Sequence, residues 1–190
     1  EEYTFMIITS PVESYYKGEL NIKVELDYTR AAKGGTGAAK AAGNYGASFY
    51  PARLAKDKGF DQLIWTDCQQ HKYIEEAGTM NIFFRRKNKL ITPQLNDSIL
   101  PGITRDSIIQ LAKYEGIDCI QENVDIKKLM KEAAEGKILE AFGVGTAVSL
   151  SKINSISYLD KKIEFQTQKD SFIEILKTKL QDIQYGRSSD

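Results

Sequence analysis

Apolar and polar residues follow two different periods along the chain, and together these predict a mixture of strands and helices. Residues 3–8 form a dense apolar run that predicts a buried strand, and residues 20–28 alternate with a period of two, which predicts a half-buried strand. Apolar residues recur at helical spacing in four segments, 44–58, 103–115, 126–135 and 171–184. Further strands are predicted at 62–66, 73–76, 80–85, 89–92, 119–124, 138–142 and 146–151, and a hairpin at 154–159 and 162–165. The pattern indicates one mixed α and β domain without an internal linker.

Charge and composition exclude several classes of function. Basic and acidic residues both number 26, so the net charge is zero and nothing favours a nucleic-acid surface. No apolar run has the length of a transmembrane helix, and no signal peptide is visible, so no membrane partner is expected. Cys68 and Cys119 are too few for a disulfide framework, which favours a reducing, cytoplasmic location. His71 is the only histidine, so a metal site or a serine–histidine mechanism is poorly supplied.

The segment 30–50 is the most unusual stretch of the chain. It holds five of the fourteen glycines, and because glycine weakens both helices and strands, its centre is expected to be irregular. Lys40 lies between pairs of alanines, and two interpretations compete for it. It is either a solvated lysine on a flexible loop, or an amine held in a tight apolar pocket where it is a nucleophile for a carbonyl group. The segment lacks the spacing of a phosphate-binding P-loop.

A second informative stretch runs from 73 to 84. Glu75 and Glu76 are adjacent in a predicted strand, so their side chains should point to opposite faces, one to solvent and one inward. An inward carboxylate needs a partner, because an unpaired buried charge is costly, and a protonated pyridine nitrogen would be such a partner. The simpler alternative for either residue is a surface glutamate.

These residues carry a resemblance to a known family. The pattern Gly-Gly-Thr-Gly-x-x-Lys-x-x-Gly-Asn-Tyr, which contains Lys40, resembles the lysine segment of branched-chain aminotransferases, in the class IV (fold type IV) pyridoxal-phosphate enzymes. Residues 76–105 resemble the class IV signature in order and spacing, and 142–147 looks like the family's Gly-Thr-Ala turn. Segments 98–105 and 182–187 match the branched-chain subgroup in particular. The resemblance covers essentially the whole chain. It implies the large cofactor-binding domain, a β pseudo-barrel or sheet flanked by helices, as a single domain over 1–190 without the family's small N-terminal domain.

The resemblance also implies roles for individual residues. Lys40 would form an internal aldimine with pyridoxal 5'-phosphate, and Glu76 would hold the pyridine nitrogen protonated. The other residues that would contact the cofactor are Tyr45 at the phenolate oxygen, Leu100 on the ring face, and Ile103, Thr104 and Thr146 at the phosphate. Those that would lie near the substrate are Tyr45, Thr79 and Ala147. Without the resemblance, Thr104 would be interpreted as a helix cap, Thr146 as a strand hydroxyl and Leu100 as core packing. No metal ligand is implied.

The implied reaction is transamination of leucine, isoleucine and valine with 2-oxoglutarate, in a homodimer of the full-length enzyme that binds small amino acids and 2-oxo acids. The chain alone is expected to be inactive, because the family's N-terminal domain supplies a phosphate-binding arginine and much of the apolar pocket. One alternative is another class IV enzyme, such as a D-amino acid aminotransferase or an aminodeoxychorismate lyase. The other is a non-catalytic binding domain with the same fold.

Overall fold

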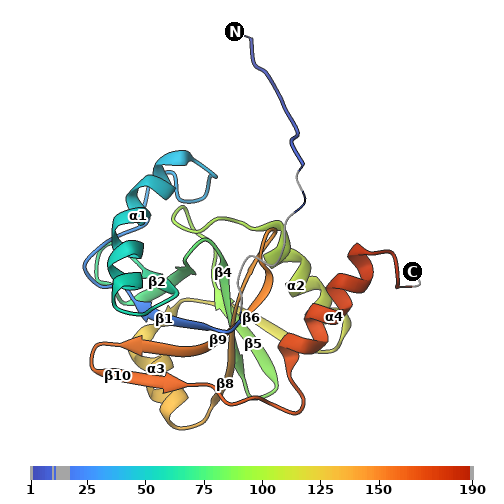
Figure 1. Ribbon diagram of the computed structural model, residues 1–190. Coiled ribbons are helices and arrows are strands. Elements are labelled where there is room, and N and C mark those ends of the chain that lie inside the picture. Colours follow the sequence, from blue (N-terminus) through green and yellow to red (C-terminus); the bar gives the residue numbers. More distant parts are fainter. Residues whose placement is uncertain (1, 10, 12–17, 189–190) are drawn as a thin grey trace.

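The computed structural model describes residues 2–9, 11 and 18–188, and these residues form ten strands and four helices (Figure 1). The elements, in chain order, are β1 (Leu20–Val24), α1 (Ala42–Asp57), β2 (Gln62–Thr66), β3 (Tyr73–Ala77), β4 (Asn81–Arg86), β5 (Lys89–Pro93), α2 (Ile103–Tyr114), β6 (Asp118–Glu122), β7 (Val124–Asp125), α3 (Ile126–Ala134), β8 (Ile138–Gly145), β9 (Ser149–Tyr158), β10 (Lys161–Glu164) and α4 (Phe172–Gln184). The predicted mixed α and β class is confirmed.

All ten strands belong to one sheet that curls back on itself. Its order is β6-β5-β4-β8-β9-β1-β2-β3-β7, with β10 paired to β9. Four strands separate β3 from β4 in this order, yet a tight turn joins the two, and Ala77 and Met80 form a bridge across it. The sheet must therefore bend until these two strands meet. The β3–β4 turn therefore lies at the place where the sheet closes.

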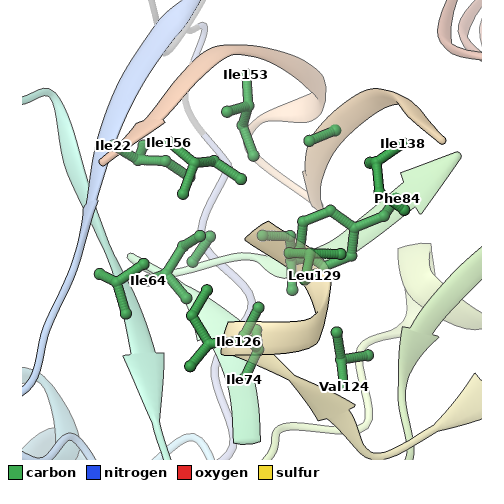
Figure 2. Close-up of a cluster of buried hydrophobic side chains, with 14 of the residues drawn as sticks. Ile22, Ile64, Ile74, Phe84, Val124, Ile126, Leu129, Ile138, Ile153 and Ile156 are labelled. Atoms are coloured by element: carbon green, nitrogen blue, oxygen red, sulfur yellow. The ribbon is translucent and has the colours of Figure 1, made fainter. Parts of the chain in front are cut away.

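The interior of the curled sheet is filled by aliphatic side chains. In Figure 2, Ile22, Ile64 and Ile156 point from the sheet toward Ile126 and Leu129 of α3. These five side chains are at most 2% exposed. Helix α3 therefore closes the interior as part of the core. This helix begins at a true cap, because the Asp125 carboxylate accepts hydrogen bonds from the first backbone N–H groups of the helix.

The other helices pack on the outer face of the sheet. Helices α2 and α4 cover β4 and β8, where the rings of Phe83 and Phe142 stack with their centroids 5.3 Å apart. Helix α1 contacts β2 through Ala55, Leu63 and Trp65. None of the helices in the described part of the chain is both long enough and apolar enough to span a membrane.

The prediction of a buried strand at 3–8 is wrong. None of the strands that the structure describes pairs with this segment, and its large apolar side chains are 72–87% exposed. In Figure 1 it extends away from the sheet. An apolar run becomes a strand only where a neighbouring strand can accept its hydrogen bonds. The first strand of the sheet, β1, already has β2 on one side and β9 on the other.

The predicted break of a strand at 143–145 is also wrong, because β8 continues to Gly145. Gly143 pairs with Ile82 of β4 and with Ser151 of β9. A Cβ atom on Gly143 would lie 2.6 Å from the sulfur of Met80, so a larger residue here would displace the Met80 side chain, and this glycine marks a close approach and not a turn. The following strand, predicted from 146, begins at Ser149 after a short turn.

Candidate active site

The glycine-rich loop that carries Lys40 is irregular, as predicted, and is held in shape by two polar side chains. The Asn44 Nδ2 atom donates hydrogen bonds to the carbonyl oxygens of Thr36 (2.8 Å) and Ala39 (2.9 Å). The Thr36 hydroxyl donates to Asn44 Oδ1 (2.8 Å). Asn44 lies in the first turn of α1, so these bonds tie the loop to the start of that helix. The threonine and the asparagine of the sequence pattern therefore have a structural explanation.

The same loop packs tightly on the segment that leads into α2. The backbone N–H of Gly34 donates to Asp97 Oδ2 (2.8 Å), and that of Ala38 donates to the Asp97 carbonyl oxygen (2.9 Å). A Cβ atom on Gly37 would lie 2.6 Å from the Cα atom of Ser98, so a side chain there would push the two segments apart. Gly37 is thus fixed by close packing of one backbone on another.

Glu76 lies near the end of β3 and contacts both the glycine-rich segment, through Arg30, and the segment that leads into α2, through Leu100. Its side chain is buried, and its Oε1 atom accepts a hydrogen bond from the backbone N–H of Leu100 (2.6 Å). Its Oε2 atom lies 3.3 Å from Nε of Arg30, whose guanidinium also donates to the carbonyl oxygen of Ser98. Burial raises the pKa of Glu76 to about 7, although Arg30 and the Leu100 N–H group act in the opposite direction.

Arg30 was missed by the sequence analysis. It precedes the glycines in a loop without periodicity, so no pattern indicated that its side chain is buried beside Glu76. A basic residue at the entrance of a glycine-rich segment that faces a predicted inward carboxylate is the only signal that could have suggested the pair.

The prediction that one of the two adjacent glutamates faces solvent is wrong. Glu75 and Glu76 are each only 4% exposed. The two side chains do line different hollows, as alternation along a strand requires. The error lies in the assumption that the outer face of β3 is open, because the segment 94–98 and the turn 67–70 lie over it.

A cavity of about 530 Å³ brings the predicted site residues together. All nine of them line it, from four separate parts of the chain: Lys40, Tyr45, Glu76, Thr79, Leu100, Ile103, Thr104, Thr146 and Ala147. The cavity lies beside the β3–β4 turn, where the sheet closes. Lys40 is exposed, so the picture of an amine enclosed in a tight apolar pocket does not describe this structure, although the amine belongs to the same cavity as Glu76.

Asn81 is a lining residue that the sequence analysis did not assign to the site. Its Nδ2 atom donates to the Leu100 carbonyl oxygen (2.8 Å). A Cβ atom on Gly102 would lie 2.2 Å from Asn81 Oδ1. Asn81 therefore fixes the chain on the approach to α2, while Glu76 fixes it from the other side through the Leu100 N–H group.

The N-terminus of α2 opens into this cavity. Gly102 is the cap residue and provides no side-chain hydrogen bond, so Thr104, in the first turn, is not the helix cap. Ile103 and Thr104 both line the cavity. Backbone N–H groups in a first helical turn have no partner within the helix and, with the helix dipole, attract anions. Thr146 lies in the turn after β8, so its hydroxyl does not belong to a strand.

Comparisons with known proteins agree with this fold. The model of the family "Amino-transferase class IV" matches residues 1–156. A relative from Staphylococcus aureus, a probable branched-chain-amino-acid aminotransferase, is 47% identical over 166 residues, which cover 85% of this chain and 46% of the relative. The crystal structure of the branched-chain amino acid aminotransferase of Escherichia coli has a TM-score of 0.80 at 27% identity, over 95% of this chain and 58% of that one.

The enzyme of the same name from Thermobaculum terrenum, solved in its PLP form, has a TM-score of 0.77 at 27% identity, over 90% of this chain and 52% of that one. The chain therefore spans about half the length of the relatives that it matches. The family match covers most of the residues of this chain, including every residue that lines the cavity. The chain belongs to the class IV aminotransferases.

Proposed function

We propose that this chain is the cofactor-binding part of a pyridoxal-phosphate-dependent aminotransferase that transfers amino groups between branched-chain amino acids and 2-oxoglutarate. The observation that carries the proposal is the convergence of nine residues from four parts of the chain on one cavity. The names of the similar proteins support the choice of substrates. Because the chain spans about half of their length, the complete activity is proposed for the full-length enzyme. The same proposal includes a homodimer, which the family resemblance implies, and a cytoplasmic location, which the two cysteines favour.

The chemistry of the cavity fits the three reactive groups of pyridoxal phosphate. The open N-terminus of α2 fits the phosphate, because first-turn N–H groups without a side-chain cap attract anions. The buried carboxylate of Glu76 fits the pyridine nitrogen, and the amine of Lys40 fits the aldehyde. Once bound, the cofactor would supply an electron sink for the carbanion at the substrate Cα atom.

Each residue then has a defined task. Glu76 would hold a proton at the pyridine nitrogen. The resulting positive charge on the pyridine ring would favour the ionised form of Glu76, which burial disfavours. Lys40 Nζ would accept the proton from the substrate Cα atom as a general base and return it as a general acid. Tyr45 would orient the phenolate oxygen, and Leu100 would pack on the ring. Thr79 and Ala147, which line the same cavity, would lie near the substrate carboxylate.

The first test is covalent trapping of the cofactor. Pyridoxal phosphate added to the chain should give a visible absorption band that borohydride bleaches, and peptide mass mapping should place the pyridoxyl group on Lys40. The variant Lys40→Ala should lose the band. Lys33→Ala is the matched control, because Lys33 belongs to the same loop but does not line the cavity. A pyridoxyl group found on another lysine would contradict the assignment.

The second test concerns the substrates. In the full-length enzyme, leucine should be a far better amino donor than D-alanine when 2-oxoglutarate is the acceptor. A preference for D-alanine would indicate a D-amino acid aminotransferase in the same family, and the absence of any transamination by a cofactor-loaded enzyme would favour a binding role.

A further inference from the structure

A second hollow lies on the other side of β3 from the cavity described above. It has a volume of about 580 Å³ and is bounded by the turn 67–70 after β2 and by the segment 94–98 before α2. Glu75 lines it, whereas Glu76 lines the first cavity. The alternation of side chains along β3 therefore gives each hollow one buried carboxylate.

The Glu75 carboxylate is the unusual feature of this hollow. The side chain is 4% exposed, and its Oε2 atom is buried without a hydrogen-bond partner among the described residues. Buried polar atoms are nearly always paired, so an unpaired carboxylate oxygen in a hollow calls for a donor from outside the chain. The neighbouring carboxylates are already engaged. Asp67 accepts three backbone N–H groups at 2.6–2.9 Å, and Asp97 accepts the N–H of Gly34.

The lining favours a cation with several N–H donors. Three carboxylates and one lysine, Lys33, line the hollow, which disfavours an anion. Five amide side chains offer further acceptor oxygens: Gln69, Gln70, Gln94, Asn96 and Asn123. Among the described residues there is no group of three histidine, cysteine or acidic side chains that could hold a metal ion, and the hollow is far larger than a bare ion needs.

We propose that this hollow is a binding site for a small molecule that carries a primary ammonium group, with the Glu75 carboxylate as its main acceptor. The ammonium group has three N–H donors and no acceptor, so one can bond to Glu75 while the amide oxygens accept the others. The site is separate from the proposed cofactor cavity and does not depend on the proposed reaction.

Ionisation of Glu75 sets the pH dependence of this binding. Burial raises the pKa of Glu75 to about 7, Arg30 and Ser98 oppose this, and Asp67 adds to it. The other charged or titratable groups around the hollow are Lys33, Cys68, Tyr73, Asp97 and, on the same strand, Glu76. Because the ligand needs the ionised carboxylate, its affinity should rise about tenfold between pH 6 and pH 8 and then level off.

A ligand bound in this hollow should also change the pKa of Glu76, which lines the first cavity. The charge of Glu75 contributes to the raised pKa of Glu76, and Arg30 lowers the pKa of both residues. A bound ammonium group cancels that charge and so lowers the pKa of Glu76. The outer hollow is thereby coupled to the carboxylate of the proposed cofactor site.

The test is a binding titration of the chain by NMR with methylammonium, beside tetramethylammonium at equal ionic strength. Two non-hydrogen atoms bound at the limit seen for the smallest ligands give a Kd on the order of 10 mM for methylammonium. Tetramethylammonium has no N–H donor and should not saturate. The variant Glu75→Gln should weaken methylammonium binding roughly tenfold or more, since it removes a charge-assisted hydrogen bond. Asp160→Asn, in the exposed turn between β9 and β10, is the matched control and should bind normally.

Two outcomes would overturn the proposal. One is equal binding of the two ions, and the other is unchanged binding by Glu75→Gln. If that variant does not fold, the wild-type chain still decides the question. With ¹³C-labelled glutamate carboxyl groups, methylammonium should lower the titration midpoint of Glu75, and the absence of any change would refute the site.

Discussion

Replacing Glu76 by glutamine should remove the dependence of stability on pH that arises from the burial of this carboxyl group. The pKa of this carboxyl is about 7 in the folded chain and 4.5 as the ordinary value, because burial disfavours the charged form. Between these two pH values the folded state binds more protons than the unfolded state, so stability falls as the pH rises. The contribution of Glu76 is complete below pH 4.5 and is lost as the pH rises through about 7.

The magnitude follows from the difference between the two pKa values. A change from 4.5 to about 7 corresponds to about 3 kcal/mol of unfolding free energy. Domains are typically stable by only about 5–15 kcal/mol, so this is a large fraction. Glu76→Gln also removes the ion pair with the buried Arg30, but only at pH values where Glu76 is ionised. The attraction of Arg30 is already included in the pKa of Glu76, so it belongs to the slope with pH, and the offset at low pH reports only the exchange of a neutral carboxyl for an amide.

The assay is urea unfolding of wild type and Glu76→Gln at half-unit steps from pH 4.5 to pH 8. The unfolding free energy of Glu76→Gln minus that of wild type should increase by about 3 kcal/mol as the pH rises over this range. Release of Glu75 from repulsion in the variant acts in the same direction. Glu174→Gln, an exposed carboxyl in α4, is the control and should run parallel to wild type. Parallel curves for Glu76→Gln would refute the reasoning.

Three further predictions concern packing and thiol chemistry. Gly37→Ala should lower the melting temperature by several degrees, because its new methyl group would lie 2.6 Å from backbone atoms of Ser98. Gly46→Ala, in the interior of α1 with no atom within 4 Å of the new methyl group, should stabilise the fold by about 0.5–1 kcal/mol. Equal effects of the two variants in thermal unfolding would exclude the packing explanation. Asn44→Ala should make the loop that carries Lys40 sensitive to limited proteolysis, because it removes the hydrogen bonds that hold this loop to α1. Ser48→Ala loses only hydrogen bonds within α1 and should not, so identical digestion patterns of the two variants would count against this role of Asn44. Iodoacetamide at pH 8 should label Cys119 about a hundredfold more slowly than free cysteine, because burial raises its pKa to about 11, and labelling at the rate of free cysteine would show that the thiol is not buried.

The sequence predicted those features that depend on local pattern. The helices and most strands appeared where the period of the apolar residues indicated. The nine predicted site residues came from a resemblance to a family, and all of them line one cavity. The pairing of Arg30 with Glu76 and the burial of Glu75 were not predictable, because both depend on the segment 94–100 folding over β3. The segment 3–8 shows the same limit, because an apolar run does not specify whether a neighbouring strand is available.

This last segment has a consequence for how the chain behaves in solution. Tyr3, Phe5, Met6, Ile7 and Ile8 are 72–87% exposed in a run without proline or charge. Short segments of this composition are those that stack into intermolecular cross-β ribbons. The chain has a net charge of zero, so copies do not repel one another at long range. These six residues outside the folded core are therefore the segment through which copies of this chain are expected to associate.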